Sequence, residues 1–256
     1  MLRQFLEEGY LVIENGLSHE IVNSLKTELD QRFESQIKVT NMKAPLNTDF
    51  GLPFNYFPGH FQLRMPTNED YLFKDLIQHP IAFPLIKQIL GKSVYLTSYT
   101  CNANYIGSPY QPKHIDSALP YDPEVLDIVG SVGPPMQIIC NYYLQDNEEN
   151  KDSLDVIPKT HKEYAFNAGE DGVIVSKYFE NKDSIRLNGK AGTLIVRDKR
   201  LWHRGTPNRS NSVRYMTSCT FTSPIMYLPQ RLKFDKETDW LWDNMNFPTS
   251  NIEPCL

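Results

Sequence analysis

Four polar residues, widely separated in the sequence, have side chains of the types that could together bind a metal ion and a carboxylate. His114 and Asp116 lie in the segment PKHIDSALP, His203 in LWHRG and Arg214 in NRSNSVRYM. Two imidazoles and one carboxylate can bind one face of a metal and leave the opposite face open, as in non-haem Fe(II) enzymes. The planar guanidinium of Arg214 suits the two oxygens of a carboxylate co-substrate.

The spacing of these residues indicates that the fold brings them together. On a strand, His114 and Asp116 point to one side while Ile115 points to the other. His203 follows the strand-like segment GTLIVRD, and Arg214 begins another apolar segment. A buried arginine is costly unless its charge is paired, and a bound dicarboxylate would pair it. Singly, each residue also fits an ordinary role in the core or in an ion pair.

Composition narrows the class of protein that can hold such a site. The chain has 256 residues, 40% hydrophobic and 22% charged, with a formal net charge of -5. This is typical of a globular protein with a sizeable core, and we expect one domain over residues 1–256. The sequence has no long basic run, no apolar stretch near the roughly 20 residues of a membrane span, and no signal-peptide pattern. We therefore expect neither a nucleic-acid nor a membrane partner.

The cysteines give an expectation about the cellular compartment. Cys101, Cys140 and Cys219 lie in apolar strand-like segments, and with Cys255 they form no paired zinc pattern. We interpret the first three as buried free thiols in a reducing compartment, which predicts a cytoplasmic protein.

The N-terminal part of the chain is predicted to be mostly helical. A short strand is expected at residues 10–14 after a brief helix. Ser18 can cap a helix running to about Phe33, because apolar residues recur there at helical spacing. Residues 40–68 are rich in proline and glycine and are expected to form an irregular lid or binding loop. Two further helices are expected near residues 71–78 and 83–90, separated at Pro80.

From Ser93 onward the pattern changes to strands. The segments SVYLTSYTCNANYI, MQIICNYYLQD, LDVIP, GVIVS, GTLIVRD and VRYMTSCTFT are rich in β-branched and aromatic residues and are separated by turn formers. Helices first and strands later predict a mainly β fold with flanking helices. A helical layer backing an antiparallel double sheet, as in jelly rolls and cupins, is the natural arrangement.

The same segments resemble those of a known family. The opening FLEEGYLVIENGLSHEIVNSLKTEL, the HID motif, the segment NYYLQDNEENKDSLDVIPKTHK and the segment GTLIVRDKRLWHRGTPNRSNSVRYM are similar to phytanoyl-CoA dioxygenase-like proteins. The resemblance covers most of residues 1–221. It implies a double-stranded β-helix (jelly roll, cupin-like) that uses Fe(II), 2-oxoglutarate as co-substrate and dioxygen.

The resemblance also assigns roles to particular residues. His114, Asp116 and His203 would bind iron, and Arg214 would hold the distal carboxylate of 2-oxoglutarate. The family often has a hydroxyl residue two positions after the distal histidine, where this chain has Gly205. Thr206, the next residue, is therefore a candidate for that contact. The histidine that corresponds to His161 is structural in the family, so we do not assign His161 to the metal.

The carboxylate ligand narrows the expected reaction. Halogenating relatives have a small residue in its place, so Asp116 favours hydroxylation, or the desaturation, epoxidation or ring chemistry of the same enzymes. The resemblance implies release of succinate and carbon dioxide. We expect a small-molecule substrate, and the biosynthesis of secondary metabolites is the favoured setting.

Several polar residues are candidates for contact with the bound molecules. Asn102 and Gln137 lie on strands flanking the motif and could contact 2-oxoglutarate or substrate. Tyr121 follows the motif and is a candidate substrate contact. Arg64 could bind an acidic group of the substrate. An ordinary loop or surface role is the alternative for the last two.

Other functions share parts of this pattern. A cupin-like metal-binding or sensing protein without turnover needs the metal ligands but has no use for Arg214. A protein-modifying hydroxylase is a third alternative. A zinc hydrolase could share the ligands, and it too gives no reason for the arginine.

Overall fold

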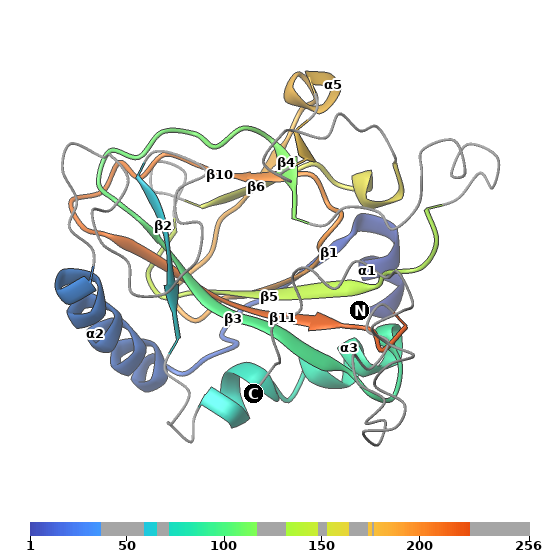
Figure 1. The fold of residues 1–256 in the computed structure, drawn as a ribbon, viewed down its shortest axis with the longest axis horizontal. Helices are drawn as coiled ribbons and strands as arrows, with labels where there is room; N and C mark the ends of the chain where they lie inside the picture. The colour runs from blue at the N-terminus through green and yellow to red at the C-terminus, as the bar shows by residue number, and fades with distance from the viewer. Residues whose placement is uncertain are drawn as a thin grey trace, which may run out of the picture.

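Two antiparallel sheets face each other in the computed structural model of this chain (Figure 1). The structure describes residues 1–36, 59–65, 72–116, 132–147, 153–163, 174–175 and 177–225. Within these residues, the larger sheet has the strand order β1-β9-β5-β11-β3-β2 and the smaller β7-β4-β10-β6-β8. This is the jelly-roll arrangement predicted from the strand-rich second half of the chain.

The strands of the larger sheet are β1 (Tyr10–Ile13), β2 (His60–Arg64), β3 (Tyr95–Asn104), β5 (Gln137–Tyr143), β9 (Leu194–Asp198) and β11 (Arg214–Thr222). Those of the smaller sheet are β4 (His114–Ile115), β6 (Leu154–Val156), β7 (Ile174–Val175), β8 (Ile185–Leu187) and β10 (His203–Gly205). All strand pairs with a given register are antiparallel.

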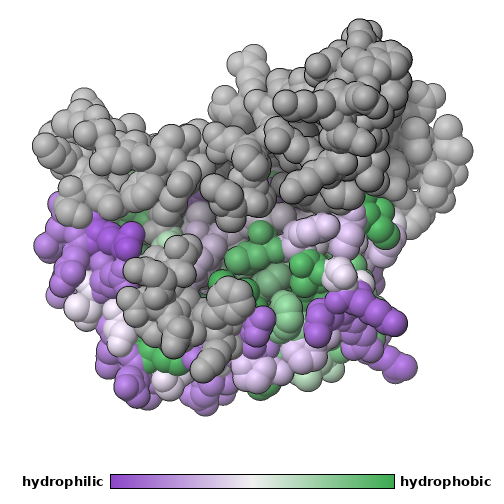
Figure 2. All heavy atoms as spheres, turned by 60° about the horizontal axis from the view of Figure 1, so that its bottom comes forward, coloured by the Kyte–Doolittle hydropathy of each residue, from purple (hydrophilic) through white to green (hydrophobic). Residues whose placement is uncertain are grey.

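Helices cover the side of the larger sheet that faces away from the smaller one (Figure 1). They are α2 (His19–Gln36), the π-helix η1 (Leu72–Ile77) and α3 (Ala82–Leu90). The helix α1 (Leu2–Glu8) lies beside β1 at one end of the sheet (Figure 1), and the short 3-10 helix η2 (Thr160–Lys162) and α5 (Lys177–Glu180) lie elsewhere. Ser18 accepts a hydrogen bond from the Ile21 amide at 3.3 Å, which confirms the predicted cap of α2. Seen from the helical side, hydrophobic surface gathers at the centre of the visible face and hydrophilic side chains border it (Figure 2).

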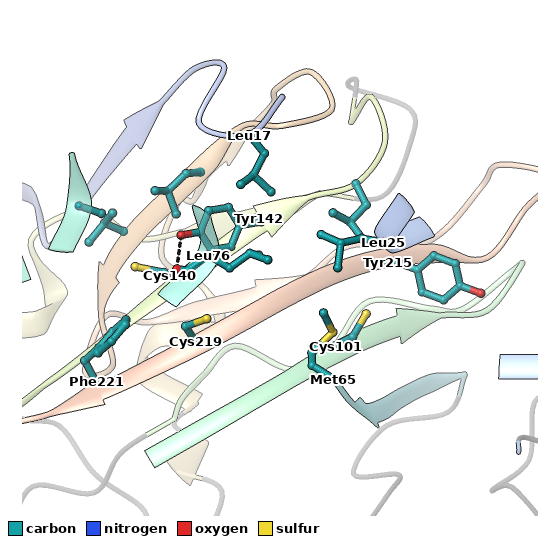
Figure 3. Close-up of a cluster of buried hydrophobic side chains, with 14 of the residues drawn as sticks. Leu17, Leu25, Met65, Leu76, Cys101, Cys140, Tyr142, Tyr215, Cys219 and Phe221 are labelled. Carbon is teal, nitrogen blue, oxygen red and sulfur yellow. Dashed lines mark hydrogen bonds between the residues drawn. The ribbon is translucent and has the colours of Figure 1, made fainter. Parts of the chain in front are cut away.

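The main core lies between the helices and the larger sheet. Figure 3 shows part of it, where the Tyr142 hydroxyl donates a hydrogen bond of 2.7 Å to the backbone oxygen of Leu76. Cys101, Cys140 and Cys219 are buried free thiols in this core, as predicted, and burial raises the pKa of each. These thiols therefore act as small apolar groups that pack the sheet against its helices.

Alternation along β11 separates this core from the interior between the sheets. Tyr215 and Phe221 pack in the helix-facing core, whereas Met216 packs against residues of the smaller sheet. Arg214 and Ser218 share the parity of Met216 and so lie on the same inner face. The interior thus receives polar side chains from a strand whose residues are all buried.

An ion-pair network holds three strands of the smaller sheet together. The Asp155 carboxylate of β6 accepts hydrogen bonds from Arg186 of β8 at 2.9 Å and from Arg204 of β10 at 3.2 Å. Its side chain is only 6% exposed. Because β10 carries His203, this network helps to fix the strand that positions a candidate ligand.

One expectation about the N-terminal half was wrong. Residues 40–68 were expected to be irregular, but His60–Arg64 forms β2 and pairs with β3. Phe61 and Leu63 alternate into the core and explain why this short segment forms a strand. Among the described helices, none has the length and apolar character needed to cross a membrane.

Candidate metal and co-substrate site

Two histidines meet across adjacent strands of the smaller sheet. His114 of β4 and His203 of β10 are register partners, and their ring centroids are 4.4 Å apart. Nδ1 of His114 lies 2.8 Å from the Pro112 carbonyl oxygen, and Nδ1 of His203 lies 2.9 Å from that of Leu201. Since a carbonyl only accepts, each Nδ1 is the donor, and each Nε2 keeps a lone pair for a metal.

Asp116 completes the predicted group. Its carboxylate oxygens lie 3.6 Å from Nε2 of His114 and 3.4 Å from Nε2 of His203. One ligand atom from each of the three residues lies within 4.8 Å of the others. Ile115 packs instead in a separate cluster with Trp202, as strand alternation predicted. The donor set and its spacing fit an Fe(II) site with one open face.

The electrostatics of the three residues favour the protonation states that bind metal. Burial acts to raise the pKa of the Asp116 carboxyl, but Arg197, then His203 and His114, hold that pKa well below its ordinary value. Burial lowers the pKa of both imidazoles, and the positive charge of Arg197 adds to this effect. An ionised carboxylate and two neutral imidazoles are the forms that coordinate a metal.

Arg197 of β9 also belongs to the site, and the sequence analysis missed it. It is 3% exposed, and its Nη2 donates to Asp116 Oδ2 at 2.5 Å. Its Nε donates to Asn141 Oδ1 at 3.0 Å, and Asn141 in turn donates to the Ser218 hydroxyl at 2.7 Å. The signal was present in the segment LIVRD, because an arginine within an apolar strand needs a partner, as was argued for Arg214.

Arg214 lies at the start of β11, on the inner face of the larger sheet. It is 3% exposed, and its guanidinium carbon lies 5.5 Å from the centre of the Tyr143 ring. Nη2 also contacts Met216 Sδ at 3.5 Å. The structure therefore places a guanidinium in the buried interior, where it could receive a carboxylate.

Gly205 stands where the family often has a hydroxyl residue, and in the structure the side chain of Gln111 lies against it. The Gly205 amide donates to Gln111 Oε1 at 2.7 Å, and a Cβ at position 205 would lie 2.8 Å from that oxygen. The Thr206 hydroxyl accepts from the Ser153 amide at 2.8 Å and donates to the Ser153 carbonyl at 3.2 Å. Thr206 thus joins β10 to the residue before β6, and its contact with 2-oxoglutarate stays a prediction.

The remaining predicted contacts are spread over the fold. Asn102 is the register partner of Met216 on the inner face, and Gln137 donates to the Thr222 hydroxyl at 3.0 Å. Arg64 is the last residue of β2 and pairs with Thr100. Tyr121 lies outside the described residues. Roles for these four in binding stay predictions.

His161 lies outside the metal-ligand group formed by the described residues. It is buried in η2, and its Nε2 lies 3.2 Å from the carbonyl oxygen of Leu6 in α1. This contact supports the structural role expected for it, because it joins the segment after β6 to the N-terminal helix.

Comparisons with known proteins agree with this geometry. The family model described as Phytanoyl-CoA dioxygenase (PhyH) matches residues 5–216. The crystal structure of HygX from Streptomyces hygroscopicus, with nickel and 2-oxoglutarate bound, is similar with a TM-score of 0.60 and 14% identity, over 87% of this chain and 85% of that one.

The epimerase SnoN, in complex with Fe3+, alpha ketoglutarate and nogalamycin RO, is similar with a TM-score of 0.64 and 14% identity, over 87% of this chain and 82% of that one. A second SnoN structure, described as a non-heme alpha ketoglutarate dependent epimerase from nogalamycin biosynthesis, has a TM-score of 0.61. At such low identity these similarities show a shared fold.

Proposed function

Because this chain belongs to the phytanoyl-CoA dioxygenase family and is a 2-oxoglutarate-dependent oxygenase that uses Fe(II) and dioxygen, we propose that it hydroxylates an unactivated C–H bond of a small molecule. Succinate and carbon dioxide would be released. The sequence alone left open a metal-binding or sensing protein without turnover. Membership of this enzyme family argues against that alternative.

The observation that carries the proposal is the convergence of His114, Asp116 and His203. The two Nε2 atoms and the Asp116 carboxylate would hold the iron, and Arg214 would bind the distal carboxylate of 2-oxoglutarate. Bound iron supplies dioxygen activation coupled to oxidative decarboxylation of the co-substrate. The protein orients the two histidines through the Pro112 and Leu201 carbonyls, and both histidines are buried.

The presence of Asp116 supports hydroxylation over halogenation, because its carboxylate occupies the position that a halide would need. SnoN, described as an epimerase from nogalamycin biosynthesis, supports a substrate from secondary metabolism. It also makes epimerisation at a C–H centre the second candidate outcome. The buried free thiols support a cytoplasmic location, and nothing in the composition favours a nucleic-acid or membrane partner.

The test is product analysis with the Fe(II)-loaded protein, 2-oxoglutarate and a panel of metabolites under isotopically labelled dioxygen. Hydroxylation predicts succinate release coupled to a product that carries one labelled oxygen atom. A product of unchanged mass and inverted stereochemistry would replace hydroxylation with epimerisation. Absence of succinate formation, with and without metabolites, would contradict the proposed function. Asp116→Ala serves as the inactive control.

A further inference from the structure

The interior between the sheets has two chemically different ends, and the inner face of β11 runs from one end to the other. Arg214 lies at one end of this strand and Thr222 at the other, with Ser218 midway. Asn141 joins Ser218 to Arg197, and Arg197 contacts Asp116, so the candidate metal site lies beside the middle of β11. Each half of the strand spans roughly 14 Å at about 3.4 Å per residue.

The end away from Arg214 carries hydroxyl and amide groups. The Thr97 and Thr222 hydroxyls lie 2.8 Å apart, and Gln137 donates to the Thr222 hydroxyl at 3.0 Å. If 2-oxoglutarate reaches from the metal towards Arg214, this opposite end is left for the primary substrate. Polar groups that face a bound ligand set its orientation.

Lys199 lies between this polar end and the metal site. Its amide donates to the Gln137 carbonyl at 3.3 Å, and its own carbonyl accepts the Asp116 amide at 3.1 Å. Arg197 points inward to Asp116, while Asp198 pairs with Arg200. Lys199 is the first residue after β9, and its amide bond to Gln137 continues the β9–β5 pairing by one residue. We therefore place Lys199 beside Gln137, on the side of the sheet that Arg197 also faces. Consistent with this position, the charges that act on its half-buried ammonium are those of Asp116 and Arg197.

Within the part of the chain that the structure describes, the Lys199 ammonium makes no hydrogen bond or ion pair. Asp116, the one carboxylate that acts on it there, already accepts a hydrogen bond from Arg197 and would also bind the metal. A partly buried ammonium without its own counter-ion is costly. A ligand that brings a negative charge would remove that cost.

The net charge of the site with metal and 2-oxoglutarate bound also predicts that it attracts an anion. The metal dication, Arg197 and Arg214 carry the positive charges, and Asp116 and the two carboxylates of 2-oxoglutarate carry the negative ones. Positive charge is in excess even before Lys199 is counted, and a buried site of this kind attracts anions.

We propose that Lys199 and the neighbouring Thr97, Thr222 and Gln137 form an anion-binding subsite, and that the primary substrate carries a carboxylate or phosphate group bound there. The subsite rests on the proposed function, because it places that substrate on the side of the metal away from Arg214. It narrows the substrate class to small anionic molecules and orients them with the anionic group at Lys199.

The test uses Co(II)-loaded protein saturated with 2-oxoglutarate, so that Arg214 and the metal are already occupied. Binding of benzoate, of the neutral and similarly shaped benzamide, and of inorganic phosphate is followed by the visible absorption of Co(II). The variants are Lys199→Met and Lys199→Arg. Lys190→Met is the matched control, because Lys190 pairs with Asp146 at the surface and its removal changes the net charge equally.

We expect the wild type to bind benzoate or phosphate at least about tenfold more tightly than benzamide. Lys199→Met should lose this preference, while Lys199→Arg and Lys190→Met keep it. Preference for benzoate alone would indicate a carboxylate substrate, and preference for phosphate alone a phosphorylated one. Equal affinity for benzoate and benzamide, failure of both anions to bind, or an unchanged preference in Lys199→Met would overturn the subsite.

The proposed function is tested separately on the wild type, by 2-oxoglutarate binding to the Co(II) form and succinate release by the Fe(II) form. If both fail, the proposed function is wrong. If both succeed while benzoate and benzamide bind equally, only the subsite is wrong.

Discussion

His114 and His203 are register partners on antiparallel strands of the smaller sheet, and their imidazole centroids lie 4.4 Å apart. The pairing of β4 with β10 therefore sets the spacing of two candidate ligands through backbone hydrogen bonds. Backbone carbonyls then fix the tautomer of each ring. The site is thus determined largely by sheet register, and its metal affinity should depend on all three ligands.

Removal of the carboxylate ligand should abolish turnover. Asp116→Ala leaves two imidazoles, and we expect Co(II) affinity to fall by about 100-fold or more and succinate release to reach background. Equilibrium dialysis and succinate assays check this. Retained turnover in a folded variant would remove Asp116 from the ligand set.

The same substitution should also destabilise the metal-free protein. Asp116→Ala leaves the buried Arg197 without its carboxylate partner, and we expect a loss of roughly 2–3 kcal/mol in the free energy of unfolding. The double variant Asp116→Ala/Arg197→Met should recover much of that loss without recovering metal binding. Urea unfolding measures both variants. Equal stability of wild type and Asp116→Ala would mean that the ion pair between Asp116 and Arg197 does not contribute to the free energy of unfolding.

Arg214→Met should weaken the binding of 2-oxoglutarate. Loss of a buried charge-assisted contact costs about 2 kcal/mol, which corresponds to roughly a 30-fold rise in the dissociation constant. Titration of the Co(II) protein with 2-oxoglutarate measures the change, and Co(II) affinity itself should stay near that of the wild type. An unchanged dissociation constant for 2-oxoglutarate would exclude Arg214 as its carboxylate partner.

Gly205→Ser would introduce the hydroxyl that relatives often carry, but Gln111 occupies the space. The new Cβ would lie 2.8 Å from Gln111 Oε1, so the glutamine must move and lose its bond to the residue 205 amide. We expect a loss of about 1 kcal/mol in thermal or urea unfolding. Gly205→Ser/Gln111→Ala makes room and should bind 2-oxoglutarate at least as tightly as Gln111→Ala. A fully stable single variant would show that Gln111 moves freely.

His79 should make stability depend on pH. Its Nε2 donates to the Gly16 carbonyl at 2.9 Å, and its Nδ1 accepts the Ala82 amide at 3.2 Å at the start of α3. Burial lowers the pKa of His79, although the Gly16 bond and Asp75 act to raise it. The unfolded chain therefore binds the proton more readily. The contribution is complete above the unfolded pKa of about 6.5 and is lost as pH falls through the lower folded pKa.

The comparison of wild type with His79→Gln isolates this effect, because other titrations largely cancel. The stability advantage of the wild type should be greatest near about pH 7.5 and should shrink towards about pH 5.5. An advantage that grows as the pH falls would show that the folded protein stabilises the protonated imidazole.

The sequence predicted the parts of the site that depend on local geometry. Strand alternation placed His114 and Asp116 on one side and Ile115 on the other, and the structure confirms it. The buried position expected of Arg214 is also confirmed. These expectations needed only the side-chain period of a strand and the cost of an unpaired charge.

The parts that were missed depend on pairing between distant segments. β2 is a five-residue edge strand, and its pairing with β3 has no local sequence signal beyond the alternation of Phe61 and Leu63. The contact between Arg197 and Asp116 depends on which face of β9 points inward. Gln111 fills the space beside Gly205 because its backbone amide donates a hydrogen bond to the Gly205 carbonyl. Long-range register decides each of these features.

The most direct test of the metal site is anaerobic crystallography of the protein with Fe(II) and 2-oxoglutarate, with the iron located by its anomalous scattering. The account predicts one iron bound by Nε2 of His114, Nε2 of His203 and the carboxylate of Asp116, with the distal carboxylate of 2-oxoglutarate at Arg214. Iron bound away from His114 and His203, or 2-oxoglutarate bound with its carboxylates away from Arg214, would contradict it.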